Sequence, residues 1–168
     1  MFSSFIFWGE LMPKFKSTKE LMKFLQSTID EVLTEDVFPV IQEAEIDTIM
    51  EVVYSQKTSG YYRRRGDAEG MGDPYNIEIQ GGVAQNGILS VINVTVPNPY
   101  LNGANERGGY ASQNKHLPEV IEYGKGYDYW KKPKKRPFTA KTIERLQSSG
   151  ECTTALKDGL RSRGIAVK

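Results

Sequence analysis

The stretch YNIEIQGGVAQNGILSVINVTV, residues 75–96, decides the fold class because its pattern predicts a β-hairpin between helical segments. Apolar residues alternate along two runs: Ile77 and Ile79 in the first, and Ile88, Ile92, Val94 and Val96 on one face of the second. Asn86-Gly87 between the runs is a strong hairpin turn signal. Gly81-Gly82 allows a bulge in the first strand.

A helical pattern precedes the hairpin. Ser17 and Glu20 fit a capping box, and apolar residues then recur at helical spacing as far as Leu33. A second helical pattern runs from about Val37 to Tyr54, and its apolar face contains Val37, Val40, Ile41, Ala44, Thr48 and Val52. Pro39 marks either the first turn of this helix or a kink in one long helix.

Helical patterns also follow the hairpin. Thr139 is a candidate cap for a helix through Ser149, and Gly150 predicts a break. A last short helix carries Ala155, Leu156 and Leu160 on its apolar stripe and ends at Gly164. The order of helices, strands and helices predicts an α+β fold.

Length and composition favour one domain. The chain has 168 residues and a mass of 18.9 kDa. Hydrophobic residues make up 39% of it, which is enough for the chain to form a core of its own. Residues 1–11 differ in composition from the remainder of the chain and form a candidate flexible or non-native leader, with Met12 as an alternative start and 12–168 as the domain. No run approaches the roughly 20 apolar residues of a membrane span, so we expect a soluble protein.

Charge is divided along the chain. Acids outnumber bases two to one in residues 1–60, whereas bases outnumber acids by more than two to one in residues 107–168, and the net charge is only +1. A general DNA-binding protein takes most of its affinity from a net positive field, which this chain lacks. The division suits a subunit whose acidic face contacts a basic face of a neighbour.

The segment SGYYRRRGDAEG, residues 59–70, is a candidate binding site. The segment has two tyrosines, which could stack on bases, next to three arginines, which could pair with phosphates: Tyr61, Tyr62, Arg63, Arg64 and Arg65. Proteins that bind single-stranded nucleic acid use this combination. Asp67, Glu69 and Asp73 oppose such contacts, which favours a docking loop whose arginines pair with carboxylates. The basic segment Lys131–Arg136 leaves the same choice between a solvated connector and a nucleic-acid patch.

Catalytic and metal motifs give little support to an enzyme. The sequence has no phosphate-binding glycine loop with its lysine, no G-x-S-x-G and no H-E-x-x-H. Asp67, Glu69 and Asp73 have oxygens for a divalent cation, but their spacing favours a solvated acidic turn. His116 and Cys152 are each the only residue of their type and are interpreted as a surface residue and an inert thiol. We expect no enzyme activity, no cofactor and no metal; an enzyme would need Tyr61 or Tyr62 to converge with His116 and an arginine.

The motifs YYRRRG, LPEVIEYGKG and RPF followed by TIERL, in this order around the hairpin, resemble the small neck and tail-completion proteins of tailed bacteriophages, in the variant from phages of Gram-positive bacteria. The resemblance covers about residues 12–165. In that family a strand ends at a Glu-Tyr-Gly motif and an Arg-Pro-Phe motif enters the last helix. These motifs would here be Glu122, Tyr123 and Gly124, and Arg136, Pro137 and Phe138.

The resemblance implies a structural virion protein that forms a ring at the head-tail junction and joins the tail to the portal-connector complex. Its partners would be copies of itself and connector or adaptor, tail terminator or tail tube proteins, and DNA would at most pass through the ring. It would be located in the virion, at the head-tail junction, after assembly in the host cytoplasm. Arg63–Arg65 would pair with carboxylates of a neighbour, the loop 100–116 and the arm 131–137 would reach adjacent rings, and the aromatic anchors would be Tyr61, Tyr62, Tyr127, Tyr129 and Trp130. The alternative is a nucleic-acid-binding accessory protein that uses Arg63–Arg65 and Lys131–Arg136 on one surface.

Overall fold

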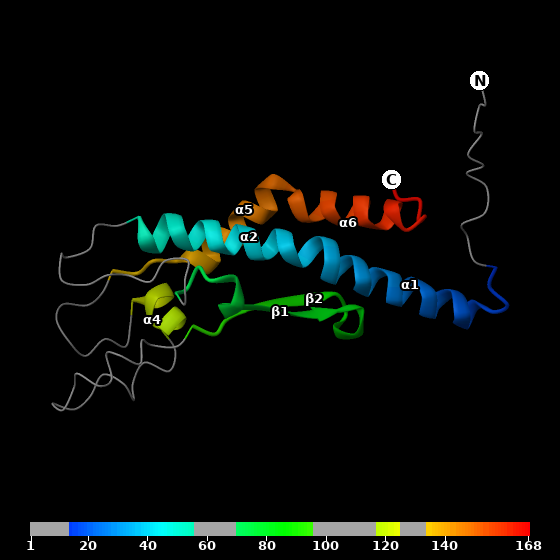
Figure 1. Ribbon diagram of the computed structural model, residues 1–168, viewed down its shortest axis with the longest axis horizontal. Coiled ribbons are helices and arrows are strands. Elements are labelled where there is room, and N and C mark those ends of the chain that lie inside the picture. Colours follow the sequence, from blue (N-terminus) through cyan, green and yellow to red (C-terminus); the bar gives the residue numbers. More distant parts are fainter. Residues whose placement is uncertain (1–13, 56–69, 96–116, 125–133) are drawn as a thin grey trace, which may run out of the picture.

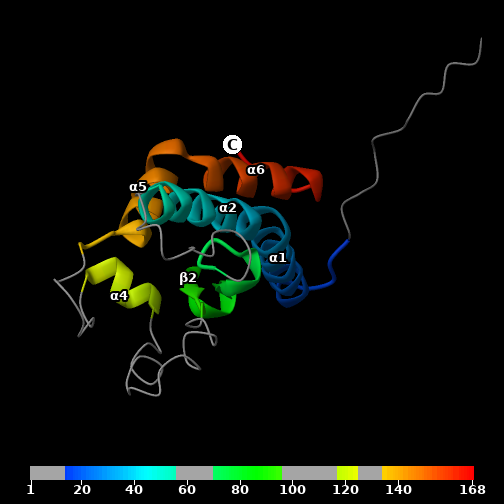
Figure 2. The same cartoon turned by 60° about the vertical axis from the view of Figure 1, so that its left-hand side comes forward.

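The computed structural model describes residues 14–55, 70–95, 117–124 and 134–168. In these parts of the chain, helices combine with a two-stranded antiparallel sheet, so the α+β prediction is confirmed. Figures 1 and 2 show three layers: one long helix lies between the hairpin on one side and the two C-terminal helices on the other.

The long helix begins as α1, Thr18–Val32, at the predicted cap. The hydroxyl of Ser17 accepts the N–H of Glu20 at 3.2 Å, and Glu20 Oε2 in turn accepts the N–H of Lys16 at 2.8 Å. The exposed N–H groups of a first helical turn need such acceptors. The capping box is therefore confirmed, with its return contact one residue before the cap.

The two predicted N-terminal helices form one continuous rod. A π-helical turn, Leu33–Val37, joins α1 to α2, Phe38–Ile49, and a second π turn, Met50–Tyr54, ends the rod. A proline in a helix lacks one N–H and crowds the carbonyl four residues earlier. The wider π turn, in which the N–H of Phe38 reaches back to the carbonyl of Leu33, accommodates Pro39 without ending the helix.

The predicted apolar face of this rod is buried. Along α2 and the turns on either side of it, the buried positions include Val37, Ile41, Ala44, Thr48 and Val52, while Val40 is half-buried. Val32 and Ile49 have no exposed surface. Helical periodicity thus identified the side of the rod that packs against the other layers.

The hairpin pairs β1, Ile77–Gly82, with β2, Ile88–Asn93, in continuous antiparallel register. Asn86 and Gly87 both adopt positive φ, as the turn signal predicts, and a short 3-10 turn at Val83–Gln85 precedes them. Gly81 pairs with Leu89 and Gly82 with Ile88, one residue for one, so the suggested bulge is not present. A Cβ at Gly81 would lie 2.1 Å from the carbonyl oxygen of Ile88, which explains the glycine.

Two polar side chains of the long helix fix the hairpin. Asp30 Oδ1 accepts the N–H of Val83 at 2.8 Å, at the turn end. At the other end, Gln42 Nε2 donates to the carbonyls of Pro74 and Ile77, at 2.9 and 3.2 Å. Hydrogen bonds at both ends of the hairpin therefore hold its inner face against the long helix.

The segment that contains the Glu-Tyr-Gly motif is helical. The resemblance implied that a strand ends there, but residues Leu117–Tyr123 form helix α4, so that expectation is wrong. Helix α5, Phe138–Ser149, stops at Gly150, whose φ is +70°. Helix α6, Glu151–Ser162, is followed by a turn at Arg163 and the positive-φ Gly164. The predicted break and the predicted end of the last helix are confirmed.

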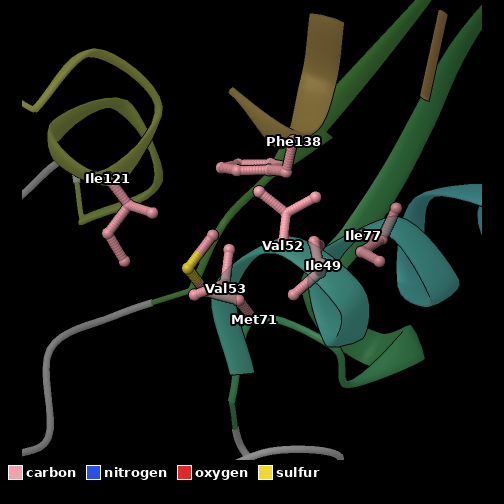
Figure 3. Packing of buried hydrophobic residues seen from close by; sticks show 7 residues of the cluster. All are labelled: Ile49, Val52, Val53, Met71, Ile77, Ile121 and Phe138. Atoms are coloured by element: carbon pink, nitrogen blue, oxygen red, sulfur yellow. The ribbon is translucent and has the colours of Figure 1, made fainter. Parts of the chain in front are cut away.

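The core lies where α2, the hairpin, α4 and the start of α5 meet. Figure 3 shows side chains from all four converging, with Phe138 above Val52 and Ile121 facing them from α4. The buried cluster consists of Ile49, Val52, Val53, Met71, Ile77, Ile121 and Phe138. Residues from α4 and α5 therefore complete a core that the long helix and hairpin begin.

Candidate functional site

Six of the predicted contact residues lie in the described part of the chain: Glu122, Tyr123, Gly124, Arg136, Pro137 and Phe138. The others lie outside it: Tyr61, Tyr62, Arg63, Arg64, Arg65, Tyr127, Tyr129 and Trp130. His116, the loop 100–116, the leader 1–11 and residues 131–133 of the basic arm are also outside. The site geometry is therefore that of the two motifs at α4 and at the entry to α5.

The two motifs are brought together. The N–H of Arg136 donates to the carbonyl of Ile121 at 3.0 Å. The carboxylate of Glu122 accepts the N–H of Thr139 at 3.0 Å and that of Ala140 at 3.4 Å. Glu122 thus caps the first turn of α5 from another helix, at the positive end of the helix dipole.

This contact replaces the predicted cap. Thr139 lies inside α5, whose N-cap position is Pro137, a residue with no side-chain acceptor. The exposed N–H groups of the first turn are served by Glu122, 17 residues earlier in the chain. The prediction that Thr139 caps the helix is wrong because a distant carboxylate takes that role.

The residues of these motifs make contacts within the chain. Phe138 is only 2% exposed and Glu122 only 8%. The guanidinium of Arg136 donates to the carbonyl of Val53 at 3.3 Å. Tyr123, at 56% exposure, is the large residue of the α4 motif that faces outward.

A cavity of about 270 Å³ lies at the same junction and is lined by Glu45, Val91, Asn93, Pro118, Glu119, Glu122, Tyr123, Phe138 and Thr139. Glu45 is only 2% exposed. Burial raises the pKa of Glu45, a hydrogen bond with Thr142 lowers it, and the charge of Glu122 raises it. The sequence analysis missed Glu45, although its place beside Ala44 and Thr48 on the apolar face of α2 was a visible signal.

Part of the charge division is used inside the subunit. Arg163, at the end of α6, contacts three carboxylates of the long helix: Glu31, Glu35 and Asp36. Arg145 of α5 contacts Asp47 at 2.9 Å. These pairs join the basic C-terminal helices to the acidic N-terminal helix of the same chain, so part of the charge division is neutralised within the chain.

The outer face of the hairpin exposes apolar side chains of the second strand beside polar ones, Glu78, Gln80 and Ser90. Ile88 is 64% exposed, Ile92 is 40% and Val94 is 39%. In the register, Ile92 is opposite Glu78, whereas the inner-face residue Ile79 is opposite Val91. The apolar face predicted for the second strand is therefore the one that points away from the long helix.

Other site types have little support among the described residues. Ranges 14–55, 70–95, 117–124 and 134–168 contain no group of three metal-ligating side chains and no helix that could cross a membrane. Asp73 accepts the N–H of Tyr75 at 3.0 Å and caps a 3-10 turn. Burial raises the pKa of the Cys152 thiol, which disfavours the reactive thiolate form.

Comparison with known proteins gives a family. The sequence model of the YomN family matches residues 17–162, which is most of the chain. The chain belongs to the YomN family. YomN is a phage-derived family, so this is a phage-associated protein. No curated protein and no solved structure was found to match it.

The YomN match begins at the cap of α1 and ends at the last residue of α6. It therefore includes the long helix, the hairpin, the junction of α4 with α5 and the whole of α6. Arg163 is the first residue after the match. The phage origin agrees with the coarser part of the resemblance drawn from the sequence. A neck or tail-completion role is a finer statement and is a proposal.

Proposed function

We propose that this YomN-family protein is a structural subunit of a tailed-phage virion, forming a ring at the head-tail junction that joins the tail to the portal-connector complex. The proposed role is assembly and sealing and needs no catalytic chemistry. Its partners would be copies of itself and the adjacent connector, terminator or tube proteins.

The observation that carries the proposal is the exposed apolar face of the hairpin. Ile88, Ile92 and Val94 form a stripe along β2, and Tyr75 beside the start of β1 is 93% exposed. Several large apolar side chains exposed on one face, with polar residues around them, are typical of interaction sites in soluble proteins. In a phage-associated chain, it is consistent with a subunit that is completed by assembly.

The arrangement of layers suits a ring. Closed rings use heterologous contacts between two unlike surfaces of each subunit. The hairpin and α6 lie on opposite sides of the long helix (Figures 1 and 2), and α5 begins in the core beside the hairpin. Residues 70–95 contain Asp73 and Glu78 and no lysine or arginine, whereas Lys134, Lys135 and Lys141 are exposed at the entry to α5 and in its first turn.

The test is the solution mass of the purified chain by light scattering, measured against concentration at low and high salt, with and without DNA. We expect a defined oligomer that grows with concentration and is unaffected by DNA. Ile92→Lys should keep the chain monomeric, whereas Thr153→Lys, which adds the same charge on the exposed side of α6, should not.

A stable monomer that binds DNA with a steep salt dependence would instead favour the nucleic-acid alternative, with Arg63–Arg65 and Lys131–Arg136 as phosphate contacts. Reversing the charge of Arg63–Arg65 separates the two: it should stop assembly in the first case and DNA binding in the second.

Location is tested separately by quantitative mass spectrometry of purified virions. A ring subunit should be present in a fixed ratio to the portal protein in complete particles. Its absence from washed particles would overturn the structural role, whatever the oligomeric state in solution.

A further inference from the structure

Helix α4 is attached to the rest of the subunit through a small set of contacts. Ile121 enters the core, its carbonyl accepts the N–H of Arg136, and Glu122 accepts two N–H groups of α5. Figure 2 shows α4 beside the start of α5. Among the side chains that the structure describes in α4, Ile121 and the buried carboxylate of Glu122 make this attachment.

A second buried carboxylate lies against this attachment from the opposite element. Glu45 projects from α2 into the cavity that Glu122 also lines, and it is less exposed than Glu122. The other titratable groups on the cavity wall are Glu119, which is exposed, and Tyr123, both on α4.

The two arginines of the neighbouring elements contact groups other than Glu45, and Lys134, Lys135 and Lys141 at the start of α5 are exposed. Arg145 of α5 pairs with Asp47 of α2, and Arg136 donates to the carbonyl of Val53. The strand β2 contributes only Val91 and Asn93 to the cavity, and none of the residues that line it is basic. A negative charge on Glu45 would therefore be buried beside that of Glu122 without a cation on the cavity wall.

The two carboxyl groups are not equivalent. Glu122 gains from its negative charge because it faces the N-terminus of α5 and accepts two of its N–H groups. Glu45 has a hydrogen bond with Thr142 but no helix end before it, and burial disfavours its charged form.

We propose that α4 docks on α2 and α5 in a pH-dependent way: a proton on Glu45 holds α4 in place, and loss of that proton releases it. When α4 moves away, the free-energy cost of the ionised form of Glu45 falls, because water reaches its carboxylate and the negative charge of Glu122 moves farther from it. The device belongs to the junction itself and does not depend on the proposed function.

The direction of the effect follows from linkage. Burial and the charge of Glu122 raise the pKa of Glu45 above its ordinary value of 4.5 in the docked state. In the proposed open state, both effects weaken, so the pKa would fall back toward that value. Opening therefore releases a proton. The fraction of open molecules should rise by up to about tenfold per pH unit above pH 4.5 and level off above the docked pKa.

The experiment is hydrogen–deuterium exchange on the full chain between about pH 4.5 and 8, corrected for the intrinsic pH dependence of exchange. Three sets of amides report on docking: those of 117–124, the N–H of Arg136 and the N–H of Thr139. Their protection should fall with rising pH and should stay below that of amides in α1 and α6, which are exposed only when the whole protein unfolds.

Glu45→Gln should abolish this pH dependence because the amide cannot ionise. Glu43→Gln, a matched change at an exposed position two residues away on α2, should retain it. The proposal is overturned if wild-type protection at 117–124 is constant with pH, if Glu45→Gln keeps the wild-type slope, or if residues 117–124 are as protected as α1 and α6 at every pH, which would mean that α4 opens only when the whole protein unfolds.

Discussion

Arg163 Nη1 lies 2.7 Å from Asp36 Oδ2, and this contact ties the last turn of the chain to the π turn in the middle of the long helix. The same guanidinium also contacts Glu35 and, at 3.8 Å, Glu31. A planar guanidinium suits several carboxylates at once. One residue near the C-terminus thus contacts three acids of the N-terminal segment, whose acidic charge the sequence analysis had matched to a basic face of a neighbour.

Arg163→Met should lower the melting temperature, because the three carboxylates then repel one another without a counter-charge. Arg161→Met is the matched control: Arg161 is exposed and contacts only Asp158 and the carbonyl of Val167 among the contacts described. Thermal unfolding at low and high salt should show a loss several-fold larger for Arg163, which shrinks with salt. Equal losses would contradict the clustered role.

Gly159→Ala should destabilise the protein although alanine is the better helix former. A Cβ at Gly159 would lie 2.5 Å from Asp36 Oδ2 and 2.6 Å from Cγ1 of Val32, which is fully buried. Overpacking of this kind costs about 1–3 kcal/mol in denaturant unfolding. Thr153→Ala on the exposed side of α6 should be close to neutral.

If the contact with Val32 causes part of the loss, the loss should be smaller when Val32→Ala makes room. In that background the additional cost of Gly159→Ala should fall. Strict additivity of the two changes would show that the close approach of α6 to α1 is not the reason for the glycine.

Ile77→Ala and Ile92→Ala should separate the two faces of the hairpin. Ile77 is 4% exposed and contributes to the core, so its truncation should cost about 2–5 kcal/mol. Ile92 is 40% exposed, and its truncation should cost clearly less in the monomer. Urea unfolding at low protein concentration measures both, and a larger loss for Ile92 would mean that the inner and outer faces are assigned the wrong way round.

Glu45→Gln should stabilise the subunit at neutral pH. The pKa of Glu45 is raised in the folded state, chiefly by burial, so unfolding releases a proton at any pH between 4.5 and the folded value. Wild-type stability should therefore fall as pH rises through that interval and remain at the lower level above it.

The variant lacks this loss, so its advantage over wild type should be small near pH 4 and reach a constant value at neutral pH. Thermal unfolding of both proteins across this range is the measurement. An advantage that grows toward low pH would reverse the sign and refute the assignment.

The local elements were predictable from the sequence because their signals are local. Ser17 and Glu20 are three residues apart, and Asn86-Gly87 defines a turn by itself. The faces of the hairpin were not predictable from the strand pattern alone. Each strand had an apolar alternation, and only the register, with Ile92 opposite Glu78, reveals that the two alternations lie on different faces.

The candidate site was predictable only in part for a similar reason. The motifs around Glu122 and Phe138 were identified, but their contact depends on a carboxylate that reaches 17 residues along the chain to Thr139. Arg163 and Asp36 are 127 residues apart. Periodicity and spacing carry no information about such pairs, because tertiary packing decides them.

The π turn at Leu33–Val37 also sets an angular relation along the rod. Each residue of an α-helix advances its side chains by about 100°. Deleting one residue from this turn would leave the core half of the rod in place but rotate the preceding half, so that Asp30 would no longer face Val83 of the hairpin. The number of residues between Asp30 and Ile41 therefore fixes the direction in which the side chains of α1 point relative to those of α2. A single-residue deletion would turn the side chains of α1 away from the hairpin and from α6 together.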